Sequence, residues 1–122
     1  MTSSPAGLTV PAAILAVGLI LFGQSAATAG DDGRACYEII GCPHEELIRQ
    51  EDLADFGCDT LYDVRNIIYK ENGYCFSTGK AIERFGNEGC RFADPLRVPL
   101  NEIERRNIAV IRAAERQRAC LP

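Results

Sequence analysis

Apolar side chains in the middle of the chain recur at the spacing of an α-helix. Leu61, Val64 and Ile68 form a stripe at intervals of three and four residues, with Asp63, Arg65 and Asn66 among the residues between them. Such a pattern is typical of a helix that buries one face. The sequence therefore predicts a helix from about Asp59 to Glu71, and we expect the rest of the fold to be arranged around it.

Polar residues at both ends of this segment are suited to begin and stop a helix. Thr60 and Asp63 have the spacing of a capping box, and Asp59 places a carboxylate at the positive end of the helix dipole. Asn72 and Gly73 favour the left-handed conformation at which helices commonly stop. Both ends of the central helix are thus predicted from the sequence.

A second long helix is expected near the end of the chain. Asn101 stands three residues ahead of Glu104, which gives a start like a capping box, and the helical pattern continues to about Gln117. Its expected inward face consists of Ile103, Val110, Ile111 and Ala114. Asn107 lies in the middle of this apolar face, and we expect its amide to bond the backbone of a neighbouring element, because an unpaired buried polar group costs about 1–3 kcal/mol.

Shorter segments of helical character precede the central helix. Residues 43–50 begin with a proline, and Leu47 and Ile48 are expected to face inward. A further helical turn is expected over residues 51–56. These segments are predicted to lead the chain into the central helix.

One more short helix and a loop are expected after the central helix. Ser77 is suited to cap a helix over residues 77–85, whose predicted inward residues are Ala81, Ile82 and Phe85. Residues 86–95 are rich in turn-forming residues and predict a loop. Residues 96–99 are expected to be briefly extended, with prolines on both sides that limit strand pairing.

The first 30 residues have the composition of a leader. They carry no charged side chain, and an apolar block from Val10 to Phe22 is followed by small residues up to Ala29. This favours a secretory signal peptide over residues 1–29, although its start lacks Lys or Arg. The alternative is an uncleaved membrane anchor, for which the block is short and interrupted by Pro11.

We expect one domain in the rest of the chain. A cysteine-containing segment with a short helix occupies residues 30–52, the main domain 53–118 and a tail 119–122. The 17 acidic and 13 basic residues give a net charge of −4, with acids concentrated towards the front and arginines towards the end. No clearly basic face follows from this distribution, so a nucleic-acid partner is not expected.

Six cysteines are a high number for so short a chain, and an exported chain would oxidise them. They are Cys36, Cys42, Cys58, Cys75, Cys90 and Cys120. We expect three disulfides that stabilise a small core, and Cys75 with Cys90 is the one pairing that we predict. No two cysteines have CxxC spacing, which argues against a zinc site or a redox pair. The fold class predicted is all-α: a small, disulfide-stapled bundle of three to four short helices, preceded by a signal peptide.

Residues suited to catalysis are scarce. His44 is the one histidine, and its place beside Pro43 and two glutamates indicates a solvated position near a helix start. Ser77 is explained by capping, and Glu45 and Glu46 lack the spacing of a cation-binding loop. We therefore expect no catalytic residue, no metal and no cofactor.

Arg65 is the polar residue of most interest, because it lies beside the apolar stripe of the central helix. A partly buried guanidinium needs a carboxylate, and Glu102 or Glu104 of the last helix are the candidates. We expect this pair, with help from Asn66, to join the two helices. The alternative is that Arg65, Asn66 and Tyr69 face an anion or a glycan.

An ordered series of motifs runs along the second half of the chain: Arg65-Asn66 followed by Tyr69, Gly73-Tyr-Cys-Phe76, Phe85-Gly86, Pro99-Leu100 and Glu102-Ile-Glu-Arg-Arg-Asn-Ile108. This series resembles the YARHG domain of bacterial exported proteins. The matching motif residues are Arg65, Asn66, Tyr69, Gly73, Phe76, Glu104 and Asn107. Lys70, Glu71 and Asn72 replace the Ala, Arg and His of the run that names the family. The cysteine-rich variant is similar to small exported proteins of alphaproteobacteria.

The resemblance implies an extracytoplasmic domain without an established activity, and it supplies no catalytic residue. We expect a periplasmic or secreted, non-enzymatic module that binds an envelope protein or the cell wall. No contact with the membrane is expected after the leader is cleaved. The alternative is a small enzyme or inhibitor built on a disulfide scaffold, for which a cleft with convergent polar groups or a protruding rigid loop at residues 86–95 would be the sign.

Overall fold

The computed structural model describes residue 7 and residues 33–122, so the expected signal peptide lies outside the described residues. The elements run in the order η1 (Gln50–Leu53), α1 (Cys58–Glu71), α2 (Gly79–Phe85), η2 (Pro95–Arg97) and α3 (Glu102–Gln117), where η denotes a 3₁₀ helix. Within the described part of the chain, β structure is limited to two isolated bridges. The all-α prediction is confirmed.

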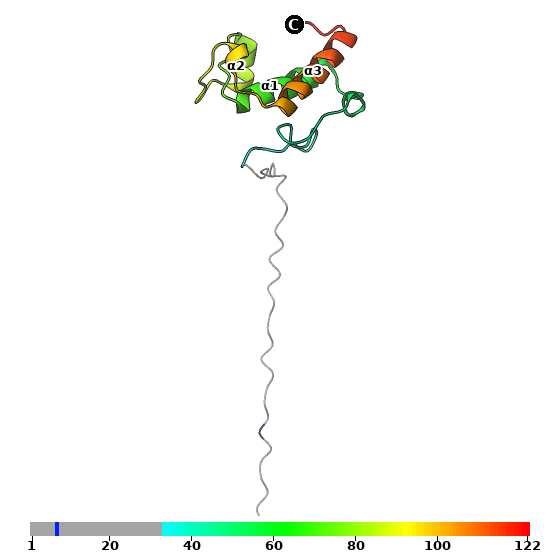
Figure 1. Ribbon diagram of the computed structural model, residues 1–122, viewed down its shortest axis with the longest axis vertical. Coiled ribbons are helices and arrows are strands. Elements are labelled where there is room, and N and C mark those ends of the chain that lie inside the picture. Colours follow the sequence, from blue (N-terminus) through cyan, green and yellow to red (C-terminus); the bar gives the residue numbers. More distant parts are fainter. Residues whose placement is uncertain (1–6, 8–32) are drawn as a thin grey trace, which may run out of the picture.

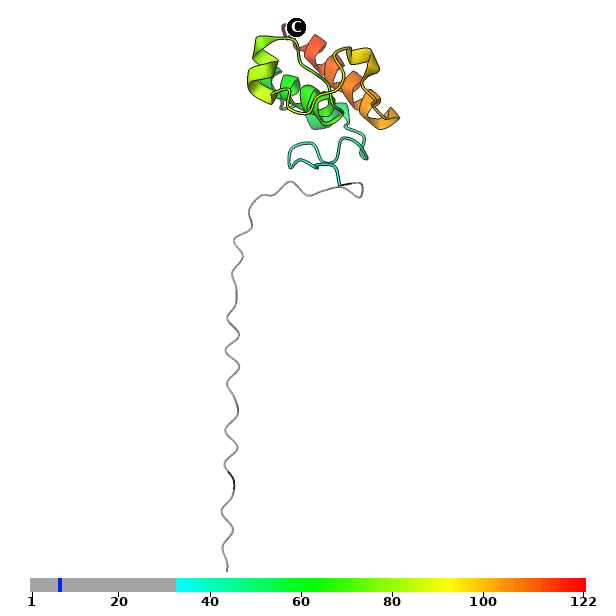
Figure 2. The same cartoon turned by 90° about the vertical axis from the view of Figure 1, so that its left-hand side faces the viewer.

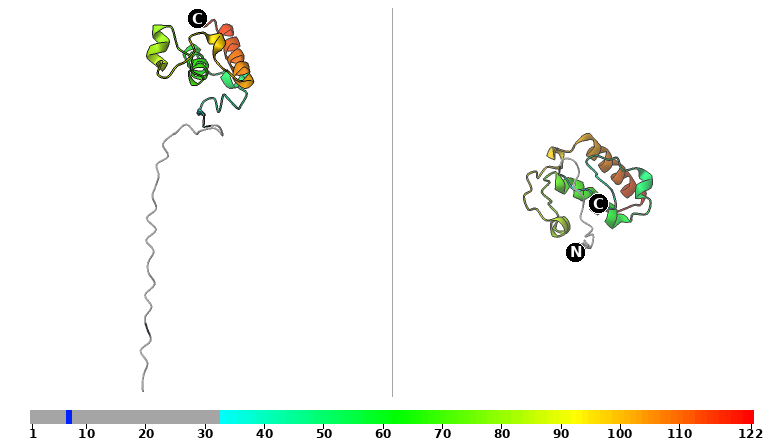
Figure 3. Two further views of the ribbon diagram at one scale, coloured as in Figure 1. Left: turned by 60° about the vertical axis from the view of Figure 1, so that its left-hand side comes forward. Right: turned by 90° about the horizontal axis from the view of Figure 1, so that it is seen from below.

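The helix α1 lies between α2 and α3 (Figures 1 and 3). The segment ahead of η1 runs beneath the three helices, and both side views place it there (Figures 1 and 2). Three disulfides link the chain: Cys36 to Cys42, Cys58 to Cys120, and Cys75 to Cys90. The pairing of Cys75 with Cys90 is the one that the sequence predicts.

The hydrophobic core forms where α1 and α3 meet. Its α1 side is the predicted stripe of Leu61, Val64 and Ile68, all fully buried. The α3 side consists of Ile108, Ile111 and Ala114, whereas the predicted inward residues Ile103 and Val110 are only half-buried. The face of α3 is rotated from the predicted one because it also buries Glu104 and Asn107, two polar residues that an apolar pattern leaves out.

The start of α1 differs from the prediction, whereas its end agrees. The helix begins at Cys58 with Gly57 as N-cap, so Thr60 and Asp63 lie inside it and do not form a capping box. Asp63 instead pairs with Arg84 of α2. At the other end, the cap is at Asn72, and Gly73 has a φ of 85°, the left-handed conformation that was expected there.

The segment 43–50 is not a helix. It forms a turn after Pro43 and then an irregular stretch up to η1, and Leu47 is 54% exposed although Ile48 is buried. The physical reason is a competing set of hydrogen bonds. The Asn107 side chain accepts from the N–H of Ile48 and donates to the carbonyls of Pro43 and Glu46, which gives this backbone partners that a helix would otherwise supply. The predicted role of Asn107 is confirmed.

The remaining corrections are local. Thr78, not Ser77, caps α2 by accepting from the N–H of Ala81. Ala81 is buried as expected, but Ile82 is exposed. Of residues 96–99, expected to be extended, the first two belong to η2 (Pro95–Arg97), whereas Val98 is extended. The cap of α3 is the predicted capping box of Asn101 and Glu104.

Candidate functional site

A groove of about 670 Å³ opens between the first half of α1, the segment 74–81 and the end of the chain. We call it the tail groove, because Ala119 to Pro122 form one of its edges. Its other lining residues are Cys58, Asp59, Tyr62, Arg65, Asn66, Tyr74, Phe76, Ser77, Thr78, Lys80, Ala81 and Glu115. It is the candidate site because aromatic and polar side chains converge there in a concave surface.

Aromatic rings form the apolar wall of the tail groove. Phe76 packs edge-on against Tyr74 with ring centroids 5.0 Å apart and stacks on Phe85 at 5.2 Å. Tyr62 contacts Phe85 from α1, with centroids 6.1 Å apart. The disulfide of Cys75, next to these rings, fixes the segment on which Tyr74 and Phe76 stand. The wall is therefore held in place by packing and by a covalent link.

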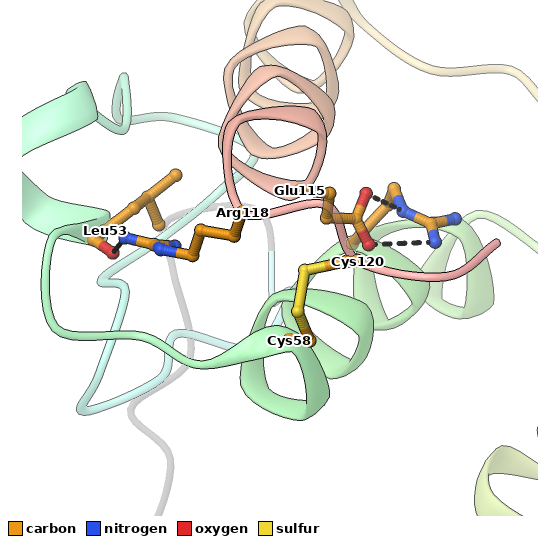
Figure 4. Close-up of a disulfide and its surroundings, with 6 residues drawn as sticks. Leu53, Cys58, Glu115, Arg118 and Cys120 are labelled. Carbon is orange, nitrogen blue, oxygen red and sulfur yellow. Dashed lines mark hydrogen bonds and ion pairs between the residues drawn. A yellow bond between two sulfur atoms is a disulfide. The ribbon is translucent and has the colours of Figure 1, made fainter.

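Cations lie over the ring of Tyr62. The Nζ atom of Lys80 lies 4.3 Å from the ring centroid and the guanidinium carbon of Arg65 lies 5.7 Å from it. Arg65 also donates two hydrogen bonds to Glu115, from Nε to Oε2 at 2.9 Å and from Nη2 to Oε1 at 3.1 Å. This two-pronged geometry is the strong form of an arginine–carboxylate pair. Glu115 stands at the end of α3, beside the Cys58–Cys120 disulfide (Figure 4).

The partner of Arg65 was predicted wrongly, and the direction of the helices explains why. The Cys58–Cys120 bridge joins the start of α1 to the chain just past α3. At the other end of the pair, the Asn72 amide donates to Glu104 at 2.9 Å. The two helices are thus antiparallel, so Arg65 meets Glu115 near the end of α3, and neither Glu102 nor Glu104 near its start. Asn66 makes no bond to α3; its amide donates to the Tyr62 carbonyl of its own helix.

A second cluster of polar residues lies at the end of α1. We call it the turn cluster, and its members are Arg34, Tyr37, Glu71, Asn72 and Glu104. Glu104 is 1% exposed and accepts from Arg34, from the Asn72 amide and from the N–H of Asn101. Tyr37 donates to Glu71. These contacts attach the segment 33–42 to the body of the domain.

Burial changes the titration of the turn cluster. The pKa of Glu71 is raised above its ordinary 4.5, first by desolvation and also by the Glu104 carboxylate, while the hydrogen bond from Tyr37 and the charges of Arg34 and His44 oppose the rise. The pKa of Tyr37 is raised as well, by burial and by its hydrogen bond to Glu71. Both pKa shifts come mainly from the burial of this tyrosine–carboxylate pair, which disfavours the charged form of each group.

His44 was expected in a solvated position, and this is wrong. Its side chain is buried, with Nε2 3.3 Å from a carboxylate oxygen of Glu45, and its carbonyl accepts from the Asn101 amide at 2.9 Å. His44 is buried because residues 43–50 do not form a helix. The turn after Pro43 instead packs against the start and middle of α3 through Asn101 and Asn107. His44 does not line the tail groove.

The motif residues divide between these places. Arg65, Asn66 and Phe76 line the tail groove, whereas Tyr69 packs in the core with its ring 5.5 Å from that of Tyr74. Arg65, Asn66 and Tyr69 therefore do not form one face for an anion or a glycan. Glu104 belongs to the turn cluster, Gly73 forms the turn beside it, and Asn107 holds the segment 43–48.

Several residues of these sites were missed from the sequence. Tyr62 and Lys80 of the tail groove do not belong to any motif recognised in the sequence. Arg34 and Tyr37 lie more than 30 residues before their hydrogen-bond partners along the chain. A helical wheel would have placed Tyr62 near Arg65 and Asn66, which is the one signal available. The reach of Arg34 across 70 positions has no local signal at all.

The chemistry of the tail groove suits binding. Its carboxylates are Asp59 and Glu115, and the second is engaged by Arg65. Among the described residues, no group of His, Cys, Asp and Glu is arranged to hold a metal ion. None of the helices in the described part of the chain has the length and apolarity that a membrane span needs.

The fold and the disulfides define a small, disulfide-stapled all-α domain. The chain belongs to the YARHG domain family, whose model matches residues 40–116, and this is a family of small domains without an established activity. No curated protein and no solved structure matches the chain.

Proposed function

We propose that this protein is an exported, non-enzymatic YARHG domain that binds another component of the bacterial envelope through the tail groove. The single observation that carries the proposal is the groove itself: an aromatic wall faced by paired charges, with the Cys58–Cys120 disulfide in its lining and the Cys75–Cys90 disulfide next to Tyr74 and Phe76. Concave surfaces that combine aromatic rings with a few fixed polar groups are typical binding sites.

Three disulfides support the export part of the proposal. All six cysteines are paired, and such bridges persist in oxidising compartments such as the periplasm. The leader-like residues 1–29 agree with this location. Periplasmic residence is thus the setting in which we expect the groove to operate.

The inhibitor alternative gains no support from the loop 86–95. A rigid protruding loop was its expected sign, but the N–H groups of Arg91 and Phe92 donate to the Gly73 carbonyl, and the Phe92 carbonyl accepts from Cys75. Residues 91 and 92 therefore lie against the segment 73–75 and do not protrude with the rest of the loop. For an enzyme, one of the two carboxylates that line the groove, Glu115, is already bound by Arg65.

Site-specific photocrosslinking in cells tests the proposal. A benzophenone amino acid at Ser77, exposed at the groove, should trap an adduct under light, whereas the same residue at Ala109, exposed on α3 and outside the groove lining, should not. Sedimentation with purified cell-wall sacculi runs in parallel and separates a wall ligand from a protein partner. Equal adducts at both positions, or none at Ser77 together with no sedimentation, would reject the tail groove as the binding site.

A further inference from the structure

The disulfide between Cys58 and Cys120 has surroundings unlike those of the other two bridges. Cys58 is exposed, whereas the other five cysteines are buried or half-buried. Cys58 and Cys120 both line the tail groove, and Cys120 also lines a second hollow of about 370 Å³ on the other side of the chain end. An attacking thiolate can therefore reach this bridge from an open surface.

Cys58 is placed to leave as a thiolate. It is the first residue of the 14-residue helix α1, and the N-cap before it is Gly57, which has no side chain to accept from the first N–H groups. Unsatisfied N–H groups and the positive end of the helix dipole stabilise a negative charge at this position. The carboxylate of Asp59 opposes this effect, but Asp59 is exposed and its charge is screened by water.

The body of the domain has other contacts that hold the end of α3. Arg118 donates to the carbonyls of Leu53 and Ala54 at 2.7 and 2.9 Å, and Glu115 is bound by Arg65 (Figure 4). Beyond Arg118, Ala119 has a φ of 51°, which a residue other than glycine rarely adopts. The N–H groups of Ala119 and Cys120 also donate to the carbonyls of Arg116 and Glu115, so opening the bridge is expected to free Leu121 and Pro122 first and to leave the helices packed.

We propose that Cys58–Cys120 is a thiol–disulfide exchange site whose substrate is an exposed protein dithiol. A thiolate of the dithiol attacks Sγ of Cys120, the bond between the two Sγ atoms breaks, and the electron pair leaves on Cys58. The second thiol then attacks the mixed disulfide and releases Cys120 as a thiolate. The dithiol loses two electrons and becomes a disulfide, the bridge gains them, and the two protons of the dithiol end on Cys58 and Cys120.

Exchange at this site alters the tail groove, a consequence that rests on the proposed function. Leu121 and Pro122 form part of one edge of the groove, so their release changes the shape of that edge. The exchange reaction itself depends only on the bridge and its surroundings. A failure of exchange and a failure of groove binding are therefore separate results.

Graded reduction of the oxidised full-length protein tests the exchange site. The protein is treated with limiting dithiothreitol for increasing times, free thiols are blocked with iodoacetamide, and the modified cysteines are identified by mass spectrometry. Cys58 and Cys120 should be modified first, while the other four cysteines stay paired and the helical circular dichroism is kept. Earlier opening of Cys36–Cys42 or Cys75–Cys90, or opening of all three bridges together with loss of helix, would overturn the proposal.

A pair of single-cysteine variants tests which sulfur leaves. In Cys120→Ser the thiol remains at Cys58, and in Cys58→Ser it remains at Cys120. The ultraviolet absorbance of the thiolate should show an ionised fraction at neutral pH roughly two- to fivefold larger for Cys58, the size expected at a helix N-terminus. Equal fractions, or a larger one at Cys120, would contradict the assignment of Cys58 as leaving group.

Discussion

At the scale of single residues, the polar side chains inside this small domain are there because each has a defined partner. Asn107 makes three hydrogen bonds to backbone groups of another segment, and Glu104 accepts from three different donors. Buried polar groups are tolerated only under such conditions. Asn107 and the half-buried Glu71, which accepts from Tyr37, can be tested individually.

Asn107→Ala should destabilise the protein by roughly 3 kcal/mol, because it leaves the N–H of Ile48 and the carbonyls of Pro43 and Glu46 without their side-chain partner. Urea unfolding followed by circular dichroism measures the change. Asn66→Ala is the matched control, since the Asn66 amide bonds only a carbonyl of its own helix, and its cost should stay under about 1 kcal/mol. A control as harmful as the test variant would show that the bonds to the segment 43–48 do not explain the role of Asn107.

Glu71→Gln should stabilise the protein near neutral pH, by up to about 1 kcal/mol for this half-buried group. The pKa of Glu71 is raised in the folded state by desolvation, so the folded protein binds the proton more tightly than the unfolded chain does. The stabilising effect of this proton is fully present below the ordinary pKa of 4.5 and is lost as the pH rises through the higher folded value. The glutamine keeps an acceptor for Tyr37 and carries no charge to desolvate.

Urea unfolding across the acid range checks the expected pH dependence of Glu71→Gln. The advantage of the variant should shrink as the pH falls towards 4.5, because protonation then removes the charge from the parent protein as well. An advantage that stays constant with pH would mean that the substitution acts by some route other than the carboxylate.

At the scale of elements, the antiparallel pairing of α1 and α3 determines which residues meet. Cys58 with Cys120, Arg65 with Glu115 and Asn72 with Glu104 are successive contacts along this pair. The sequence predicts both helices and the existence of an arginine–carboxylate pair between them. It does not predict the partner, because helix direction is a tertiary property that local periodicity does not contain.

A double-mutant cycle on Arg65 and Glu115 should give a coupling energy of about 1–2 kcal/mol. Their side chains are 18% and 14% exposed and share two hydrogen bonds, so water weakens the pair only in part. The cycle uses Arg65→Ala, Glu115→Ala and the double variant in urea unfolding. The surface pair of Arg106 and Glu102, at 63% and 73% exposed, is the matched comparison and should couple by at most about 0.5 kcal/mol. Equal coupling in both pairs would argue against a clamp between the helices.

At the scale of the whole molecule, a small hydrophobic core, three disulfides and long-range polar contacts together stabilise the fold. The helix class, the stop at Asn72 and Gly73, the capping box of α3 and the Cys75–Cys90 bridge follow from short sequence patterns. The burial of His44 and the irregular path of residues 43–50 do not, because side chains more than 50 residues away determine them. The tail groove also escapes prediction, since three separated segments form it.

The attachment of the segment 33–42 is the clearest long-range feature of the fold. This segment is closed on itself by the Cys36–Cys42 bridge, and the guanidinium of Arg34 joins it both to Glu104 and, at 3.0 Å, to the side-chain oxygen of Asn72. Because Glu104 is almost fully buried, removing its cation leaves a charge that the Asn72 and Asn101 groups stabilise only in part.

Arg34→Ala should therefore cost roughly 2 kcal/mol, below the usual loss for a broken buried pair because Arg34 itself is 27% exposed. Arg34→Lys keeps the positive charge and should recover part of the loss, since both contacts come from the single Nη2 atom of Arg34 and one ammonium nitrogen carries three donors. Adding Glu104→Gln to Arg34→Ala removes the buried charge and should restore stability relative to Arg34→Ala alone. If this second substitution made the protein still less stable, Glu104 would owe its place to helix capping through Asn101, and the ion pair with Arg34 would contribute little to the fold.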